Sequence, residues 1–186
     1  MARTSIPSKA EPAERERTPF NWKPFAIAAV VVAAFAALIV LDPAPPGVEF
    51  PDQGNLHLVD ATQDHVPYNS RPASSGPHIG GGFPTGVQAD PVPEEFFVHT
   101  LEDGGVVFAY DCPDGCDDLV AELTTITEED SRRLLTPYEG ISNEGTEYRA
   151  AAVVWTRIFY FDELDEGTRS SLETFLSLYE GVDHHA

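Results

Sequence analysis

Lysine is absent from the chain after Lys23, although the sequence continues to residue 186. From residue 42 on, six arginines stand against 28 aspartates and glutamates, which leaves this part with a formal charge of −22. Nucleic acid would bring like charges together on such a surface, so we exclude it as a partner. The acidic surface is compatible with cations, with basic partners, or with simple solvation in a salty medium.

Cysteine occurs only twice, as Cys112 and Cys116 in the segment CPDGC. Two cysteines are too few for the paired Cys-x-x-Cys knuckles of a standard zinc site. A short loop with proline and glycine can bring two sulfurs together, and paired cysteines outside the cytoplasm usually oxidise. We therefore favour a Cys112–Cys116 disulfide; a thiolate metal site and a redox pair, as in a thiol–disulfide enzyme, are the alternatives.

A strong catalytic motif is also missing from the sequence. Ser75, Asp103 and either His78 or His99 supply the side chains of a hydrolytic triad, but no G-x-S-x-G elbow accompanies them. Glu102 and Asp103 are adjacent, so in a strand they would point to opposite faces and could not act as a carboxylate pair. The sequence thus gives no reason to expect an enzyme.

A long apolar run is present once, at residues 25–41, and contains 17 successive positions without a polar side chain. As a helix it is about 25 Å long, nearly the thickness of a hydrocarbon core. Five basic residues precede it and none follows closely, which predicts a cytoplasmic N-terminus and a domain outside the cytoplasm. A cleaved signal peptide would have a shorter apolar stretch and a small-residue cleavage site. We therefore expect a single-pass cell-membrane protein whose partners include the lipid bilayer.

The rest of the chain divides by composition. We expect a disordered tail at 1–22, a transmembrane helix at 23–41, a Pro/Gly-rich linker at 42–55, a domain at 56–181 and a tail at 182–186. Within the domain, the patterns predict strands at 96–101, 105–111, 132–138 and 148–161, and helices at 117–126 and 162–181. The order β-β-α-β-β-α predicts an α+β fold, a small antiparallel sheet with helices on one face.

Histidines and cysteines in this domain form a candidate metal site. The candidate ligands are His65, His78, His99, Cys112 and Cys116. Imidazole and thiolate are borderline and soft donors, which favours a transition metal such as copper. The spacing matches no standard zinc signature, and the same residues are also compatible with a purely structural role. We expect His57 to be an ordinary surface residue, and His184 and His185 to belong to the mobile tail.

An interaction module is the hypothesis from a different functional class. The membrane anchor and an acidic domain with few motifs are typical of an accessory subunit that binds a membrane-protein partner. In that case the disulfide is purely structural.

Two segments carry a resemblance to a known family: HVPYNSRPASSGPH (65–78) and VHTLEDGGVVFAYDCPDGC (98–116). With TPY (136–138) and AVVWTR (152–157), they resemble the domain of unknown function 3105 family. The resemblance spans about residues 56–180 and implies an anchored or secreted bacterial protein without an established activity.

Two positions differ from the pattern of that family. Arg71 stands where the family usually has proline, and Asp103 where it usually has histidine. If that histidine is a metal ligand in relatives, Asp103 replaces a nitrogen donor with a harder oxygen. The resemblance then implies a weaker site for copper or zinc in this chain.

Overall fold

The computed structural model describes residues 44–82 and 84–185, together with Ala26, Ala28 and Ala29. The tail expected at 1–22 and nearly all of the membrane helix expected at 23–41 lie outside these residues. Within the described part, no helix combines the length and the apolarity that crossing a bilayer requires. The contacts divide the chain into residues 1–44 and 45–186, and the second unit contains every element described below.

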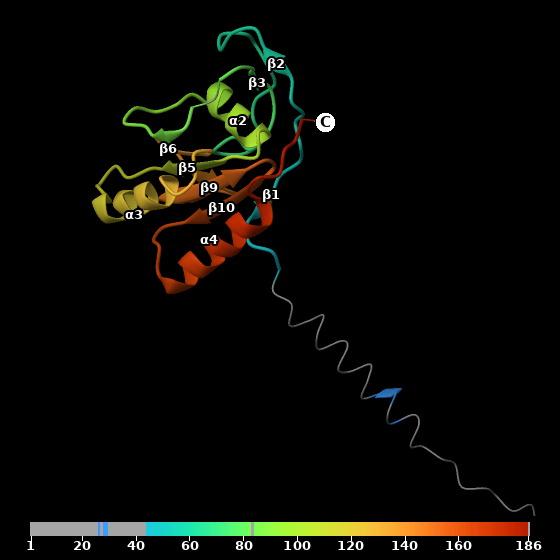
Figure 1. Cartoon of the computed structure of the whole chain (residues 1–186), viewed down its shortest axis with the longest axis vertical. Coiled ribbons are helices and arrows are strands. Elements are labelled where there is room, and N and C mark those ends of the chain that lie inside the picture. The colour runs from blue at the N-terminus through green and yellow to red at the C-terminus, as the bar shows by residue number, and fades with distance from the viewer. Residues whose placement is uncertain (1–25, 27, 30–43, 83, 186) are drawn as a thin grey trace, which may run out of the picture. The chain divides into compact units, whose positions relative to one another are not determined.

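A six-stranded mixed sheet is the centre of the domain (Figure 1). In spatial order its strands are β1 (Val48–Glu49), β10 (Arg157–Phe161), β9 (Ala150–Val154), β5 (Val106–Tyr110), β6 (Arg133–Pro137) and β4 (Gly86–Val87). The pairs β5/β6 and β4/β6 are parallel, and the other pairs are antiparallel. The sheet is therefore mixed, and the expectation of a purely antiparallel sheet is wrong. Helix α3 (Asp117–Thr127) crosses from β5 to β6, and such a crossover makes consecutive strands parallel.

Helices cover both faces of this sheet, which corrects the expectation of helices on one face. Alternate residues of β5 point to opposite faces: Val107 belongs to one core cluster and Phe108 to the other. Helix α2 (Glu94–Glu102) packs on the first face, while α3 and α4 (Glu166–Tyr179) pack on the second (Figure 1). Every core position of β5 is apolar because the strand is buried from both sides. The class of the fold, mixed α and β, is as predicted.

The segment 96–101 is part of helix α2, so the strand predicted there is wrong. Phe97, Val98 and Leu101 are fully buried and share one face of the helix, at the spacing i, i+1, i+4. The β-branched and aromatic residues of this segment favoured a strand locally, but packing of this apolar stripe on the sheet favours the helix. This correction moves Glu102 onto the same helical face as His99.

Three other segments also differ from expectation. The single strand predicted at 148–161 is a hairpin of β9 and β10, whose turn includes Thr156 with φ of 61°. Strand β1 and the hydrogen bond from the Phe50 amide to the Thr156 carbonyl attach part of the expected linker to the domain. The C-terminal residues are also attached, because the His184 amide donates to the Glu102 carbonyl at 2.9 Å. The helices predicted near α3 and α4 and the strand predicted near β6 are confirmed.

Candidate metal site

Two histidines reach the site from a small parallel pair of strands beside the main sheet. His57 begins β2 (His57–Leu58) and His78 begins β3 (His78–Ile79), and the two residues are register partners. Register partners of a β-ladder present their side chains on the same face, so their rings lie together, with centroids 4.9 Å apart. His57 is half-exposed, whereas His78 is fully buried.

Helix α2 supplies the other two members of the site from its last turn. His99 and Glu102 are separated by three positions and therefore lie on one face. Both are buried, and the rings of His78 and His99 lie with their centroids 5.2 Å apart. The site thus joins a helix end to a pair of strands that precede it in the chain.

The donor atoms of these residues converge on the carboxylate of Glu102. Its Oε2 atom lies 2.9 Å from His78 Nε2, 3.3 Å from His57 Nε2 and 3.4 Å from His99 Nδ1. One ligand atom from each of the four side chains falls within a group whose members are all within 4.8 Å of one another. Three imidazole nitrogens and a carboxylate oxygen form a ligand set of the kind that binds zinc or copper.

The backbone fixes the orientation of the His78 ring. His78 Nδ1 lies 2.9 Å from the carbonyl oxygen of Gly76, so Nδ1 carries the proton and donates it there. In the neutral tautomer Nε2, which faces Glu102, then carries a lone pair. Histidine ligands of metals commonly donate their second nitrogen to a carbonyl or carboxylate in this way.

The electrostatics of the site favour the forms of the side chains that bind metal. Burial raises the pKa of Glu102, but side-chain hydrogen bonds with His57 and Asn55 outweigh burial and hold that pKa below its usual value. For His99, burial is the main cause that lowers its pKa, and it outweighs the opposing charge of Asp103. A carboxylate and a neutral imidazole are the forms that coordinate a cation.

The loop before His78 is fixed by hydrogen bonds outside the site. The Glu94 side chain accepts a hydrogen bond from the Ala73 amide at 2.8 Å, which ties the loop to the start of α2. Tyr68 Oη donates to the Pro77 carbonyl at 2.6 Å, next to His78. After β3, a Cβ on Gly80 would lie 2.8 Å from Nδ1 of His57, so the His57 ring packs where only glycine leaves room.

Of the histidines predicted as ligands, the structure brings His78 and His99 together and places His65 elsewhere. His65 Nε2 lies 3.5 Å from Glu95 Oε1, and its Nδ1 faces the carbonyl of Val66. Sequence reasoning missed His57, which it treated as surface, and Glu102, which it placed just after the strand predicted at 96–101. The spacing of His99 and Glu102 would have indicated a shared face if this segment had been assigned as a helix.

The two cysteines form a disulfide, as predicted. Cys112 and Cys116 lie in the turn between β5 and α3, and their sulfurs are bonded to each other rather than available as thiolates. The five-residue strand β5, roughly 17 Å long, separates this turn from the end of α2 where the imidazoles meet. The disulfide is therefore part of the scaffold and not of the histidine site.

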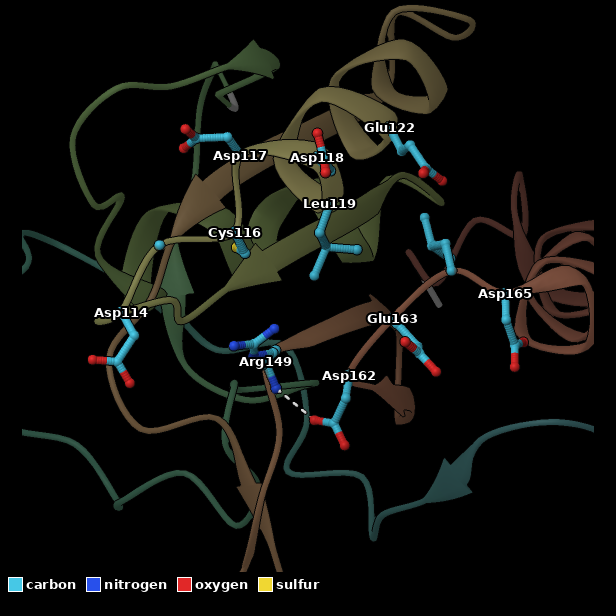
Figure 2. Close-up of a pocket in the computed structure, with 12 residues that line it drawn as sticks. Asp114, Cys116, Asp117, Asp118, Leu119, Glu122, Arg149, Asp162, Glu163 and Asp165 are labelled. Atoms are coloured by element: carbon cyan, nitrogen blue, oxygen red, sulfur yellow. Dashed lines mark hydrogen bonds between the residues drawn. The ribbon is translucent and has the colours of Figure 1, made fainter.

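An acidic cleft of about 790 Å³ opens beside the disulfide, and Figure 2 shows its lining. Its carboxylates are Asp114, Asp117, Asp118, Glu122, Asp162, Glu163 and Asp165. Several already have a structural role: Asp165 accepts a hydrogen bond from the Thr168 amide as the N-cap of α4, and Asp162 accepts one from the Arg149 amide. The cleft is best described as a solvated acidic surface.

In the comparison with protein families, residues 60–185 match a model described as a protein of unknown function (DUF3105). The chain belongs to the DUF3105 family. The match confirms the resemblance seen in the sequence and includes His78, His99 and Glu102, whereas His57 precedes it. No curated protein and no solved structure matches this DUF3105 chain.

Replacing both cysteines by serine tests whether the disulfide and the histidine site are independent. We expect Cys112→Ser/Cys116→Ser to lower the free energy of unfolding by about 2 kcal/mol, the loop entropy that a closed ring of five residues removes from the unfolded chain. The metal affinity of the histidine cluster should equal that of the unaltered protein, because no sulfur lies among the candidate ligands. Chemical denaturation and calorimetric metal titration measure the two quantities; loss of metal binding in a folded variant would contradict the independence.

Proposed function

We propose that this DUF3105 domain binds one divalent transition-metal ion through His57, His78, His99 and Glu102. The four side chains come from three separate elements and meet around one point. Two of them are fully buried, and buried ionisable groups are retained where they are paired or bind metal.

The crowding around one carboxylate oxygen is the observation that carries this proposal. Oε2 of Glu102 faces a ring nitrogen from each of His57, His78 and His99. His78 has an acceptor at both of its nitrogens, the Gly76 carbonyl and Glu102, while a neutral imidazole has one proton. A metal ion removes this mismatch, because it accepts lone pairs from the imidazoles and from the carboxylate at once.

Copper(II) is the metal that we propose, with zinc as its closest competitor. Imidazole suits both ions, and copper(II) binds a given nitrogen and oxygen site more tightly than the other divalent ions of the first row. The disulfide removes the thiolates that would favour copper(I).

We further propose that the domain is anchored to the cell membrane and lies outside the cytoplasm. The uninterrupted apolar run at 25–41 and the basic residues before it support an anchor with this orientation. The disulfide also supports an oxidising compartment, since such bonds are rare in the cytosol.

Metal binding is tested by titrating the full-length protein in detergent with copper(II) and with zinc(II). We expect one ion per chain, and we expect His99→Ala and Glu102→Gln each to lower the affinity at least about 100-fold, because each removes a ligand. Calorimetry and metal analysis after dialysis measure affinity and stoichiometry.

The matched control for these variants is His65→Ala, since His65 is a neighbouring histidine outside the cluster. It should bind metal as the unaltered protein does. Circular dichroism checks that each variant is folded. A folded, unaltered protein that retains neither copper nor zinc would refute the proposal.

Two glycines offer a test that changes no ligand. Gly80→Ala places a methyl group 2.8 Å from His57 Nδ1, so we expect it to displace that ring and to weaken metal binding about tenfold. Gly82→Ala is the matched control, because a Cβ there meets nothing within 4 Å. Equal affinities of the two variants, measured by calorimetry, would exclude His57 from the ligand set.

The anchor is tested by fractionating cells that express the full chain. We expect the protein in the membrane fraction, resistant to alkaline carbonate, with its domain accessible to protease added from outside. Ala33→Asp at the centre of the run should release it, because a central aspartate costs about 2.5–3.5 kcal/mol of insertion free energy. A full-length protein recovered in the cytosolic fraction would contradict the anchor.

A further inference from the structure

The C-terminal segment, residues 181–185, returns from α4 to the end of α2, beside the proposed metal site (Figure 1). Hydrogen bonds hold the backbone of this segment near its beginning, at Gly181, and near its end, at His184. Before it, Glu180 forms a two-pronged ion pair with Arg133, with both N–O distances 2.7 Å. The Gly181 amide donates to the Gly104 carbonyl at 2.7 Å, and the His184 amide donates to the Glu102 carbonyl. The segment is therefore attached to the backbone that carries the central carboxylate.

The side chain of His184 strengthens this attachment. Its ring stacks on Trp155, with centroids 5.7 Å apart and planes 21° from parallel. The indole is nearly buried at the turn between β9 and β10, so it offers a rigid surface. With residue 184 held in this way, the next residue is directed toward the cluster.

His185 presents one nitrogen to the cluster and ties the other to a carboxylate. Its Nε2 lies 3.3 Å from Glu102 Oε2, the same oxygen that faces His57, His78 and His99. Its Nδ1 donates to Asp183 Oδ1 at 2.8 Å, which leaves the lone pair on Nε2. This is the arrangement of His78, with a carboxylate in place of the carbonyl, and it is common among metal ligands.

His185 nevertheless differs from the four inner ligands. Its side chain is 44% exposed, it lies outside the group of atoms within 4.8 Å of one another, and its Nε2 is also 3.5 Å from Asp103 Oδ1. It lies on a segment that two backbone hydrogen bonds and the stack of His184 on Trp155 attach to the domain. Such a residue can leave the metal without disturbing the inner ligands.

We propose that His185 is a fifth, exchangeable ligand of the same metal, and that a small anion from solution takes its position when the His185 side chain turns away from the metal. This inference rests on the proposed metal site. A divalent ion with one ligating carboxylate keeps one positive charge, which favours a small anionic ligand at the vacated position. Metal sites that exchange ligands keep one such position open, while closed sites are structural.

Azide binding to the copper(II)-loaded full chain tests this proposal, because azide is a small anion whose coordination to copper(II) gives a charge-transfer band. His185→Ala opens the fifth position, and His185→Phe keeps a ring over the site but lacks a donor nitrogen. We expect both variants to hold one copper per chain and to bind azide about tenfold more tightly than the unaltered protein. Their copper spectra should match each other and differ from that of the unaltered protein.

The other outcomes separate this inference from the metal site itself. Absence of copper from all three proteins would overturn both proposals. One copper per chain with equal azide affinities in all three would overturn the role of His185 and leave the inner site intact. If His185→Phe behaves like the unaltered protein and only His185→Ala differs, the side chain covers the metal without coordinating it, and the ligand assignment is wrong.

Discussion

A buried carboxylate is the constraint around which this domain is arranged. An ionised side chain that leaves water loses several kcal/mol of solvation, and it remains charged only where partners compensate for that loss. Glu102 is fully buried, and its partners are nitrogen atoms from strands β2 and β3, from its own helix and from the C-terminal segment. Strands β2 and β3 pair with each other and α2 packs on the sheet, so the nitrogens of His57, His78 and His99 are gathered before any ligand binds.

The sheet gives this arrangement its rigidity. Helix α2 can place His99 and Glu102 only because its opposite side, with Phe97 and Leu101, is fully buried against β5 and its neighbours. On the other face, α3 and α4 bury the remaining side of the same strands, so the platform under α2 has little freedom to shift. A site built on packed elements holds donor atoms more precisely than a site built on loops alone.

The sequence predicts the parts of this structure whose signals are local. The helical spacing at 117–126 and 162–181, the strand at 132–138 and the disulfide across CPDGC all depend on neighbours in the chain, and all are found. The aromatic and β-branched residues of the segment 96–101 favour a strand, but the segment is a helix. Its packing on a sheet whose strands come mostly later in the chain stabilises the helix. That one error hid Glu102, since His99 and Glu102 share a face in a helix. His57 and His185 could not be identified from the sequence, because they lie 45 and 83 residues from Glu102 along the chain. The pairing of β2 with β3 brings His57 to the site, and the return of the chain after α4 brings His185.

Asp103, at the C-terminal end of α2, lies next to the proposed metal site. Its carboxylate lies 3.7 Å from His99 Nε2 and 3.5 Å from His185 Nε2. His99 directs its other nitrogen at the cluster, so Asp103 lies on the outer side of that ring, where acceptors orient metal-ligating imidazoles and raise their basicity. For His185, the proposed fifth ligand, the same carboxylate competes with Glu102 for one nitrogen, Nε2. In the proposed site, Asp103 therefore orients an inner ligand, His99, and competes for the proposed exchangeable ligand, His185.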